Sequence, residues 1–519
     1  MSDQDDHEGA DDDRAGADDD RAGADDDGAG ADDDQFRAES GFEPNNGTKP
    51  RSDGGTTSAH EHTMSDTEDT TNFDPVEPNP NDAHEAVDVF PDAEDFDLRP
   101  GADSCYKCSS CDTSCPVAEV DDDFPGPKFQ GPEQWRLTQT DEDYEVDDSV
   151  MSCSNCMRCD DACPSGVPLS QMHNTTRGRY VDEQMSKLSV EYWRNRILAN
   201  YRTSAFFASK VPRLANAAMN FGPARWLMEK TMGITSEREF PAFAKETFRD
   251  WWAAEGGAAG SVERAKAHRE RRGEPADADK QVAYFHGCYA NYNTPEVGKA
   301  MVRVFEYFGY EVVVPEQGCS GTPMFANGML DDARRDAKVN VSSLSDLVEQ
   351  GYDAICSCTS CSMSLRQEYP ELFDFEGTAE VAAHTYEAVE YLRIHEDLAD
   401  EVAEAHVGGE LAEEFAYHAP CHARNQGLDR QAVELFRDLD GVDIEDVGDS
   451  CSGISGTYGW KEEKYENSMA IGEEMFEHMD HAEGETGMTE CPTCAMQMEH
   501  GTGYEIRHPL ELLEAALVE

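Results

Sequence analysis

Two stretches of the sequence carry cysteines at the same spacing. Each is a Cys-x2-Cys-x2-Cys-x3-Cys-Pro run, one from Cys105 to Pro116 and one from Cys153 to Pro164. Three thiolates at this spacing fit three corners of a cubane [4Fe–4S] cluster, and the fourth cysteine of each run reaches the other cluster. Zinc is the alternative, but zinc sites usually need only Cys-x2-Cys pairs. We therefore predict two [4Fe–4S] clusters, one held by Cys105, Cys108, Cys111 and Cys163 and the other by Cys153, Cys156, Cys159 and Cys115.

The later cysteines form two matching ladders of four. Both ladders span 73 positions, at an offset of 133, which marks an internal repeat. Four thiolates suit a [4Fe–4S] cluster or a tetrahedral zinc ion, and both stay open from the residues alone. Of the two we favour one further Fe–S cluster at each ladder. The ladders are Cys288-x30-Cys319-x38-Cys358-x2-Cys361 and Cys421-x29-Cys451-x39-Cys491-x2-Cys494.

Four residues close to the ladders are not expected to be ligands. Cys356 falls outside the repeat, so we predict that it packs in the core. His286, His418 and His422 flank the first cysteine of each ladder. Histidines in such places more often position a ligand through hydrogen bonds than bind the metal.

Short apolar runs alternate with helical patterns over residues 281–519. Such alternation favours parallel α/β units. Each ladder cysteine then lies at or just beyond the carboxyl end of a strand, which is where open parallel sheets hold their ligands. Strands are predicted at 282–285, 310–314, 352–355, 415–417, 442–444 and, weakly, before Cys491. Helices are predicted at 295–308 and near 329–350, 429–439 and 463–480.

The chain of 519 residues is long enough for several domains. We predict an α+β multidomain protein in which an α-helical double ferredoxin precedes two duplicated α/β units. The final part of the helical connector, 256–280, is rich in Gly, Ala and charged residues and is predicted to be a linker. The predicted parts are a disordered acidic low-complexity tail (1–95), a two-cluster ferredoxin domain (96–175), a helical connector (176–280) and two cysteine-rich domains (281–405 and 406–519).

The sequence is strongly acidic along its whole length. It holds 109 Asp and Glu against 42 Lys and Arg, a net charge of −67, and only 32 of the acidic residues fall in positions 1–100. Such a charge argues against nucleic acid as a partner, because phosphate binding needs a basic face. It is typical of extreme halophiles, where molar salt shortens the Debye length to about 3 Å and screens self-repulsion.

The N-terminus shows no secretory signal, and no apolar run is long enough for a transmembrane helix. Clustered cysteines without an export signal favour metal binding over disulfides. Met64-Ser65-Asp66 resembles the first three residues, so Met64 is an alternative start.

A basic island interrupts the acidic sequence between Arg177 and Arg249. It holds 13 basic and seven acidic residues. We expect it to be a docking surface for a membrane or for acidic partner subunits, in the manner of a basic amphipathic helix. The alternative is that its charges complement anionic clusters and acidic neighbours inside the fold. Its members include Arg194, Arg196, Arg202, Lys210, Arg213, Arg225 and Lys230, with the apolar residues Phe206, Phe207, Trp226 and Leu227.

Several strings resemble known families. The 37 residues between Cys115 and Cys153, followed by helical sequence, are similar to the α-helical ferredoxin module of respiratory iron–sulfur proteins. The ladders resemble the CCG domain pair of the heterodisulfide reductase family, and local matches are Gly287–Tyr292, Tyr417–His422 and His508–Leu513. The order of these parts over 96–519 resembles the iron–sulfur C subunits of anaerobic glycerol-3-phosphate dehydrogenases, in a haloarchaeal form.

This resemblance implies a non-catalytic electron-transfer subunit. A flavoprotein partner would oxidise sn-glycerol 3-phosphate, and this chain would pass the electrons singly to a membrane quinone. It would lie in the cytoplasm, peripherally on the inner face of the cell membrane. No Gly-rich nucleotide fingerprint follows a strand here, so we expect the chain to bind neither FAD nor glycerol phosphate itself.

One departure from the CCG pattern concerns the middle of each ladder. The family has Cys-Cys-Gly there, whereas this chain has Cys319-Ser320-Gly321 and Cys451-Ser452-Gly453. Five cysteines per site hold a noncubane cluster in heterodisulfide reductases, and each ladder here offers four. The departure counts against disulfide reduction as the function of this chain. Two alternatives stay open: a heterodisulfide reductase-like enzyme, and an iron–sulfur protein of a lactate or glycolate oxidase system.

Overall fold

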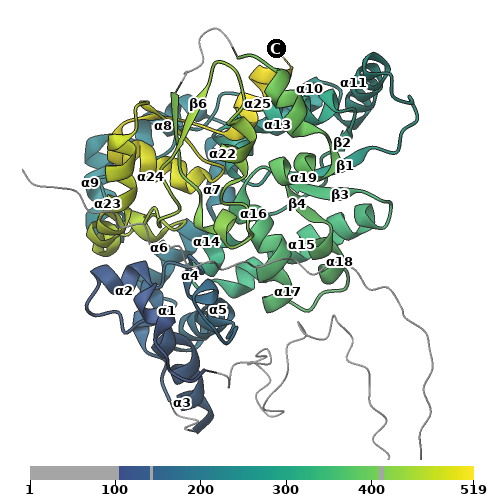
Figure 1. The fold of residues 1–519 in the computed structure, drawn as a ribbon. Coiled ribbons are helices and arrows are strands. Elements are labelled where there is room, and N and C mark those ends of the chain that lie inside the picture. The colour runs from purple at the N-terminus through teal and green to yellow at the C-terminus, as the bar shows by residue number, and fades with distance from the viewer. Residues whose placement is uncertain (1–104, 141–143, 408–413, 519) are drawn as a thin grey trace, which may run out of the picture. The chain divides into compact units, whose positions relative to one another are not determined.

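The structure is a computed structural model that describes residues 105–140, 144–407 and 414–518 (Figure 1). The predicted tail 1–95, the first residues of the predicted ferredoxin domain and Met64 lie outside the described residues. The described part consists of a helical, cysteine-rich segment followed by two units of parallel sheet and helix. The predicted fold class is thus confirmed for this part.

Short helices surround the two Cys-x2-Cys-x2-Cys-x3-Cys runs. Two of them, α1 and α4, occupy the same place in the two runs, since each begins two residues after the second cysteine and contains the third. The helices of this segment are α1 (Ser110–Thr113), α2 (Pro116–Val120), α3 (Gln134–Thr140), α4 (Arg158–Asp161) and α5 (Leu169–Arg179).

The backbone before α1 and α4 is left-handed at two residues in each run. The φ angles are 64° at Lys107, 66° at Ser109, 55° at Asn155 and 60° at Met157. A left-handed conformation costs a residue with a side chain roughly 1–2 kcal/mol. The same backbone strain occurs at matching positions of both runs. It indicates that the arrangement of the cysteines around a common space determines the conformation of both loops.

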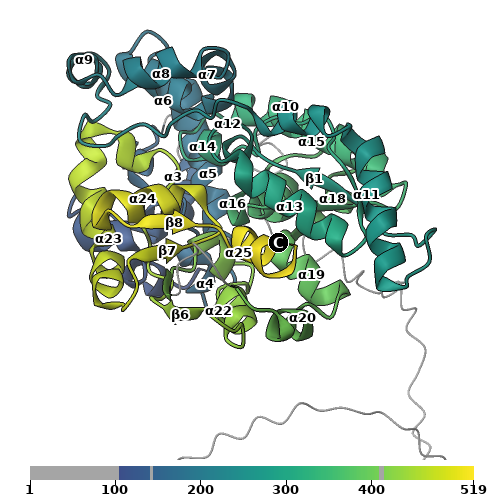
Figure 2. The same ribbon diagram turned by 90° about the horizontal axis from the view of Figure 1, so that it is seen from above.

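Six helices connect this segment to the first sheet. Their bounds are α6 (Val190–Ala199), α7 (Tyr201–Ala208), α8 (Pro212–Met219), α9 (Gly222–Met232), α10 (Phe248–Ala254) and α11 (Gly257–Arg272). Figure 2 shows α7, α8 and α9 as neighbours on one side of the described part. No helix among the residues that the structure describes is long and apolar enough to cross a membrane.

The predicted linker at 256–280 is wrong for most of its length, because α11 occupies it. Arg269 is completely buried and donates to the carbonyl oxygen of Gly309 at 2.7 Å. It also pairs with the carboxylate of Glu311 at 2.7 Å, and Arg264 pairs with Glu306. Charged residues that suggested a solvated linker are therefore partners of the first sheet unit.

Each of the two sheets contains four parallel strands. The first has the order β2-β1-β3-β4, and the second repeats it as β6-β5-β7-β8. Three strands of each sheet were predicted, whereas β4 and β8 were not. The strands are β1 (Gln281–Phe285), β2 (Glu311–Val313), β3 (Asp353–Cys356), β4 (Thr385–Glu387), β5 (Glu414–Tyr417), β6 (Asp443–Asp446), β7 (Thr486–Met488) and β8 (Glu505–Arg507).

The helices of the two units follow the strands in the same pattern. A one-turn helix carries or follows the first cysteine of each ladder, and a longer helix follows its second cysteine. In the first unit the helices are α12 (Tyr289–Tyr292), α13 (Pro295–Tyr307), α14 (Thr322–Phe325), α15 (Leu330–Val348), α16 (Thr359–Met363), α17 (Tyr369–Leu372), α18 (Thr378–Ala383), α19 (Ala388–His395) and α20 (Leu398–Glu404). In the second they are α21 (Cys421–Arg424), α22 (Gln431–Phe436), α23 (Tyr465–His481), α24 (Pro492–Thr502) and α25 (Pro509–Leu517).

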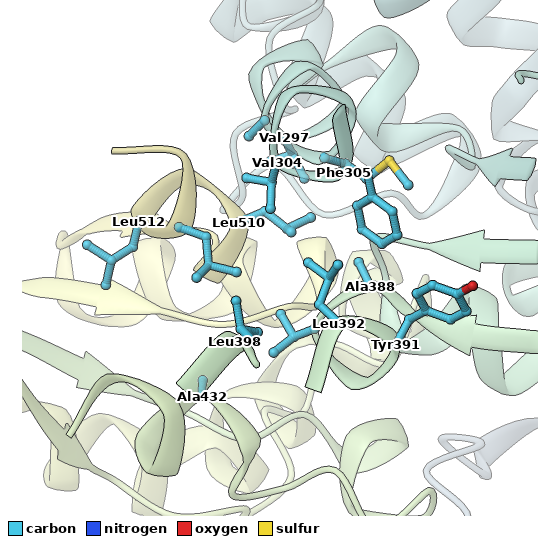
Figure 3. Close-up of a cluster of buried hydrophobic side chains, with 14 of the residues drawn as sticks. Val297, Val304, Phe305, Ala388, Tyr391, Leu392, Leu398, Ala432, Leu510 and Leu512 are labelled. Carbon is cyan, nitrogen blue, oxygen red and sulfur yellow. The ribbon is translucent and has the colours of Figure 1, made fainter. Parts of the chain in front are cut away.

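The two sheet units share one hydrophobic core. Figure 3 shows side chains of α13, α19, α20, α22 and α25 gathered in a single cluster. Leu510 and Leu392 are completely buried in it, as are Val304 and Leu398. Burying a side chain of this size contributes roughly 1.5–3 kcal/mol. The shared core holds the two sheets in a fixed relation, and with them the two cysteine ladders.

Candidate iron–sulfur centres

The first set of thiols mixes cysteines from both runs. Cys105, Cys108, Cys111 and Cys163 line one small cavity, which Val167 and Leu169 close on its apolar side. Cys163 comes from the second run and joins three cysteines of the first. Cys108 is exposed, whereas Cys111 is buried, so this set lies at the protein surface.

The second set is buried more deeply. Cys115, Cys153, Cys156 and Cys159 line a second cavity together with His173. His173 donates from Nε2 to the carbonyl oxygen of Pro127 at 2.9 Å and contacts the Cys153 Sγ atom through Nδ1 at 3.7 Å. Burial alone would raise the pKa of Cys153, but Arg177 and His173 outweigh it and lower that pKa to about 7.

The eight ladder cysteines meet at a single place. Every one of them follows the carboxyl end of a parallel strand, as predicted, and all eight line one cavity of about 200 Å³. Cys156 of the second set lines the same cavity. The ladders therefore form one continuous group of thiols at the junction of the two sheet units, next to the helical segment.

The thiols of this group interact in three separate sets. Cys156 packs with Cys451 and Cys421. Cys491 contacts Cys494 in its own ladder and Cys358 in the other. The remaining thiol pairs lie within the first ladder and are Cys358 with Cys361 and Cys288 with Cys319.

The serines that replace the second cysteine of the family pattern contact the last thiol of their own ladder. Ser320 Oγ accepts from Cys361 Sγ at 3.4 Å, and Ser452 Oγ donates to Cys494 Sγ at the same distance. The glycine that follows each serine is left-handed, with φ of 104° at Gly321. A side chain on Gly453 would lie 2.1 Å from a backbone oxygen, so the backbone there has room for glycine alone.

The chemistry of these donors fits iron–sulfur clusters. Burial raises the pKa of Cys159 well above its usual value, and Asp160 adds to the shift. Burial likewise raises the pKa of Cys111 to about 12. Thiolates crowded in such places need a compensating positive charge, which bound iron supplies. The two ferredoxin sets each line a cavity of their own, and the two ladders line one cavity together.

The helical segment is tied to both sheet units beside Cys156. Asn155 donates from Nδ2 to Glu368 Oε1 in the first unit at 3.1 Å. Its carbonyl oxygen accepts from His422 Nε2 in the second unit at 3.2 Å. Arg177, which is completely buried, donates to the carbonyl oxygens of Phe325 and Cys153. These bonds fix the second thiol set against the ladders.

Comparisons with known proteins agree with this arrangement. Residues 101–167 match the 4Fe-4S dicluster domain family, and residues 282–366 and 415–499 both match the cysteine-rich domain family. The chain is 32% identical over 425 residues to the C subunit of anaerobic glycerol-3-phosphate dehydrogenase from Escherichia coli K12, and the match covers 80% of this chain and 98% of that protein. The chain belongs to the family of anaerobic glycerol-3-phosphate dehydrogenase C subunits.

Two further relatives match parts of this family member. The B subunit of fumarate reductase (CoM/CoB) from Methanothermobacter marburgensis is 29% identical over 46% of this chain and 46% of its own length. Lactate utilization protein A 2 of Bacillus cereus Q1 is 26% identical over 39% of this chain and 83% of its own length. Iron–sulfur binding and electron transport follow from the dicluster and cysteine-rich domains of the chain.

The histidines near the ladders of this family member have different surroundings. His286 accepts from Arg249 Nε at 3.0 Å, and burial with the nearby arginine lowers its pKa to about 3. His422 donates to the backbone, as described above. His418 is completely buried, and neither of its ring nitrogens has a partner among the described residues. Cys356 lies in the core beside Ala283 and does not line the cavity, as expected.

The residues that connect the sets were not predicted from the sequence. Asn155 and Glu368 lie far apart in the chain, and nothing in their local sequence predicts that they pair. The left-handed conformation of Asn155 has one sequence signal, since asparagine tolerates it better than most residues.

Proposed function

We propose that this chain is the iron–sulfur electron-transfer subunit of an anaerobic glycerol-3-phosphate dehydrogenase. A flavoprotein partner oxidises sn-glycerol 3-phosphate to dihydroxyacetone phosphate, and this chain carries the electrons to a membrane quinone. The observation that carries the proposal is the series of thiol sets from the exposed Cys108 to the first ladder, with Cys156 and Cys451 in contact at its centre.

The proposed ligands are the sixteen cysteines of the four sets. A bound [4Fe–4S] cluster takes up and releases single electrons. The protein keeps water away, because the ladder cysteines are buried or half-buried. Hydrogen bonds to ligand sulfur atoms, such as that from Ser452 to Cys494, tune the potential of a cluster.

Electron entry is proposed at the first thiol set. Cys108 is exposed, and Tyr106 beside it is 64% exposed. The second set, with Cys153 and Cys156, is buried against the ladders. A flavoprotein can therefore approach the first set closely, whereas the other sets are reached only through the protein.

The helices α7 to α9 are proposed as the surface that holds the chain at the inner face of the membrane. Phe207 is 67% exposed and Trp226 60% exposed, and Phe206, Leu214 and Phe221 are exposed as well. Such aromatic side chains on short helices favour a position in the interface plane of a bilayer.

The cations of the basic island divide between this surface and the interior. Arg194 is buried and pairs with Glu463 at 2.6 Å, and Arg225 is buried against Phe240 and backbone carbonyls. Those two were expected at the docking surface, and that expectation is wrong because internal partners hold them. Lys210, Arg213 and Lys230 are exposed, and they accompany the aromatic residues.

The experiment that tests the function combines the chain with its flavoprotein. The complex is treated anaerobically with sn-glycerol 3-phosphate, and cluster reduction is followed by electron paramagnetic resonance at low temperature. We expect substrate-dependent reduction of the clusters and, with a short-chain quinone, their reoxidation. Reduction by lactate or glycolate with their own flavoproteins, and none by glycerol 3-phosphate, would contradict the proposal.

Disulfide reduction is the second candidate, favoured by the cavity that all eight ladder thiols line. It predicts that the isolated, cluster-loaded chain turns over a thiol–disulfide couple. The serines at positions 320 and 452 count against it.

A further inference from the structure

A second cavity lies beside the first ladder. Its volume is about 430 Å³, and Cys288, Cys358 and Cys361 form part of its wall. The first sheet unit contributes α12 and the start of α13, and the second contributes α24, β8 and the start of α25. It differs from the cavity that all eight ladder thiols line, because no cysteine of the second ladder borders it. Its size is that of a small-molecule site.

Two hydroxyl groups at this cavity are available to a ligand. Thr489 is 2% exposed, and its Oγ1 atom is buried without a hydrogen-bond partner among the described residues. Tyr289, from the other sheet unit, also lines the cavity. Buried polar groups are normally paired, and each exception needs an explanation. A ligand that accepts a hydrogen bond would satisfy Thr489, and a second acceptor atom on it could bind the hydroxyl of Tyr289.

Three other polar side chains of the wall already have partners. His508 donates from Nε2 to the carbonyl oxygen of Ser357 at 2.7 Å and accepts from the Leu510 amide through Nδ1. His286 accepts from Arg249. Arg507 pairs with Glu505 at 2.6 Å. The hydroxyls of Thr489 and Tyr289 are neutral donors, which suit a neutral acceptor such as a carbonyl oxygen.

The wall of this cavity continues into the proposed membrane surface. Asn293 lines the cavity, and its Oδ1 atom accepts from the hydroxyl of Tyr201 in α7 at 2.7 Å. Phe243 and Tyr292 form a small core with residues of α7 and α8. Ala244, next to Phe243, lines the cavity as well. A chain held at a bilayer through α7 to α9 thus brings this cavity close to the lipid.

We infer that this cavity binds the head group of a lipid para-quinone, between the ladder thiols and the hydroxyls of Thr489 and Tyr289. The inference rests on the proposed function, in which a quinone is the electron acceptor, and adds where it binds. A para-quinone is planar and neutral, and its two carbonyl oxygens accept the two hydrogen bonds that the cavity offers.

The reaction at this site converts a quinone into a hydroquinone. The quinone receives two electrons, one at a time, from the reduced iron–sulfur protein, and two protons from water. Each carbonyl oxygen becomes a hydroxyl, and the ring becomes aromatic. No other bond breaks. The electrons come ultimately from glycerol 3-phosphate through the flavoprotein.

Binding of menadione to the cluster-loaded full chain tests the site by calorimetry. Thr489→Val and Tyr289→Phe remove one hydroxyl each and keep the shape of the side chain. Loss of one neutral hydrogen bond corresponds to about 0.5–1.5 kcal/mol, so we expect affinity to fall roughly 2- to 12-fold for each. Unchanged affinity in both variants, with menadione still bound, would overturn the assignment.

A matched pair of variants controls for the fold. Ala244→Phe places a ring in the wall of the cavity, and Ala242→Phe places the same ring at an exposed position two residues away. We expect menadione binding to be lost in the first variant and kept in the second, with equal iron content in both. Equal binding in the two variants would contradict the inference.

Cross-linking with an azido-substituted short-chain quinone separates the inference from the function on which it rests. Labels on peptides that contain Tyr289 or Thr489 support the site. Labels elsewhere, with quinone still reduced by glycerol 3-phosphate in the complex, would overturn the site and leave the proposed function intact. Absence of quinone reduction by a complex whose clusters are reduced would contradict quinone as the acceptor.

Discussion

The side chains of Cys156 and Cys451 pack in one cluster and line one cavity, although 295 positions of the chain separate them. Cys156 belongs to the dicluster segment, and Cys451 is the second cysteine of the second ladder. This contact joins the deeper thiol set of the ferredoxin segment to the ladders. It places the second ladder next to the deeper thiol set of the dicluster segment.

The bonds of Asn155 are predicted to keep this contact in place. Asn155→Gly retains the left-handed backbone and removes the amide that donates to Glu368. A buried carboxyl group that loses a donor costs about 1–3 kcal/mol. We expect unchanged iron content, normal reduction of the dicluster segment and slower reduction of the ladder clusters.

Freeze-quench paramagnetic resonance of the complex checks the prediction for Asn155. Asn425→Ala is the control, because Asn425 also donates to this region, at the carbonyl oxygen of Cys156, but over a longer distance of 3.3 Å. We expect Asn425→Ala to slow the reduction of the ladder clusters less than Asn155→Gly does. Equal rates of ladder-cluster reduction in Asn155→Gly and in the unmodified chain would show that the hydrogen bonds of Asn155 do not govern electron transfer to the ladders.

Loss of the exposed cysteine of the first set is predicted to stop electron flow. Cys108→Ser removes one of four ligands, so we expect loss of that cluster, about four iron atoms per chain, and of glycerol 3-phosphate-dependent quinone reduction. Iron analysis and the activity of the complex are the measurements. Cys356→Ala is the matched control, since Cys356 lies in the core and outside all four sets. Loss of iron in the control as well would point to general unfolding.

The serines of the ladders offer a test of cluster type. Ser320 and Ser452 each contact the last thiol of their ladder at 3.4 Å. Ser320→Cys is therefore expected to bring a fifth thiol to the first ladder and to change the paramagnetic resonance spectrum. Ser345→Cys, on α15 and away from the ladder, is the control. A noncubane signature in the unmodified protein would contradict the assignment of four-cysteine clusters.

The membrane surface is predicted to depend on its aromatic residues more than on its cations. In molar salt the Debye length is about 3 Å, so attraction between distant charges is nearly absent. Replacing Phe206, Phe207 and Trp226 with serine should release the chain from vesicles, while changing Lys210, Arg213 and Lys230 to glutamine should have a smaller effect. Vesicle flotation at high salt measures both. Unchanged flotation of the folded aromatic variant would exclude α7 to α9 as the anchor.

The ladder repeat predicted more of the structure than the apolar patterns did. Its eight cysteines were expected at strand ends and are found there, because a parallel sheet brings the carboxyl ends of its strands to one edge. β4 and β8 were missed because both are short and mostly polar, Thr385–Glu387 and Glu505–Arg507, and so lack the run of valines that marks the equally short β2. That both ladders share one cavity depends on the core between the units, which no local pattern encodes.

The charge of the basic island did not predict which of its residues are exposed. The island between Arg177 and Arg249 was expected at the surface, yet Arg177, Arg194 and Arg225 are buried. Their partners are backbone carbonyls or carboxylates, some of them distant in sequence, such as Glu463 for Arg194. Apolar residues of the same island are exposed because no other part of the described chain covers them.

Analysis of iron, acid-labile sulfide and zinc in the anaerobically purified full chain tests the central claim most directly. The claim is that all four thiol sets hold iron–sulfur clusters. It predicts about eight iron atoms from the dicluster segment and further iron and sulfide from the ladders, about four of each per ladder if both hold a [4Fe–4S] cluster. Eight iron atoms with two zinc ions would contradict the claim for the ladders, and zinc without iron would contradict it for the whole chain.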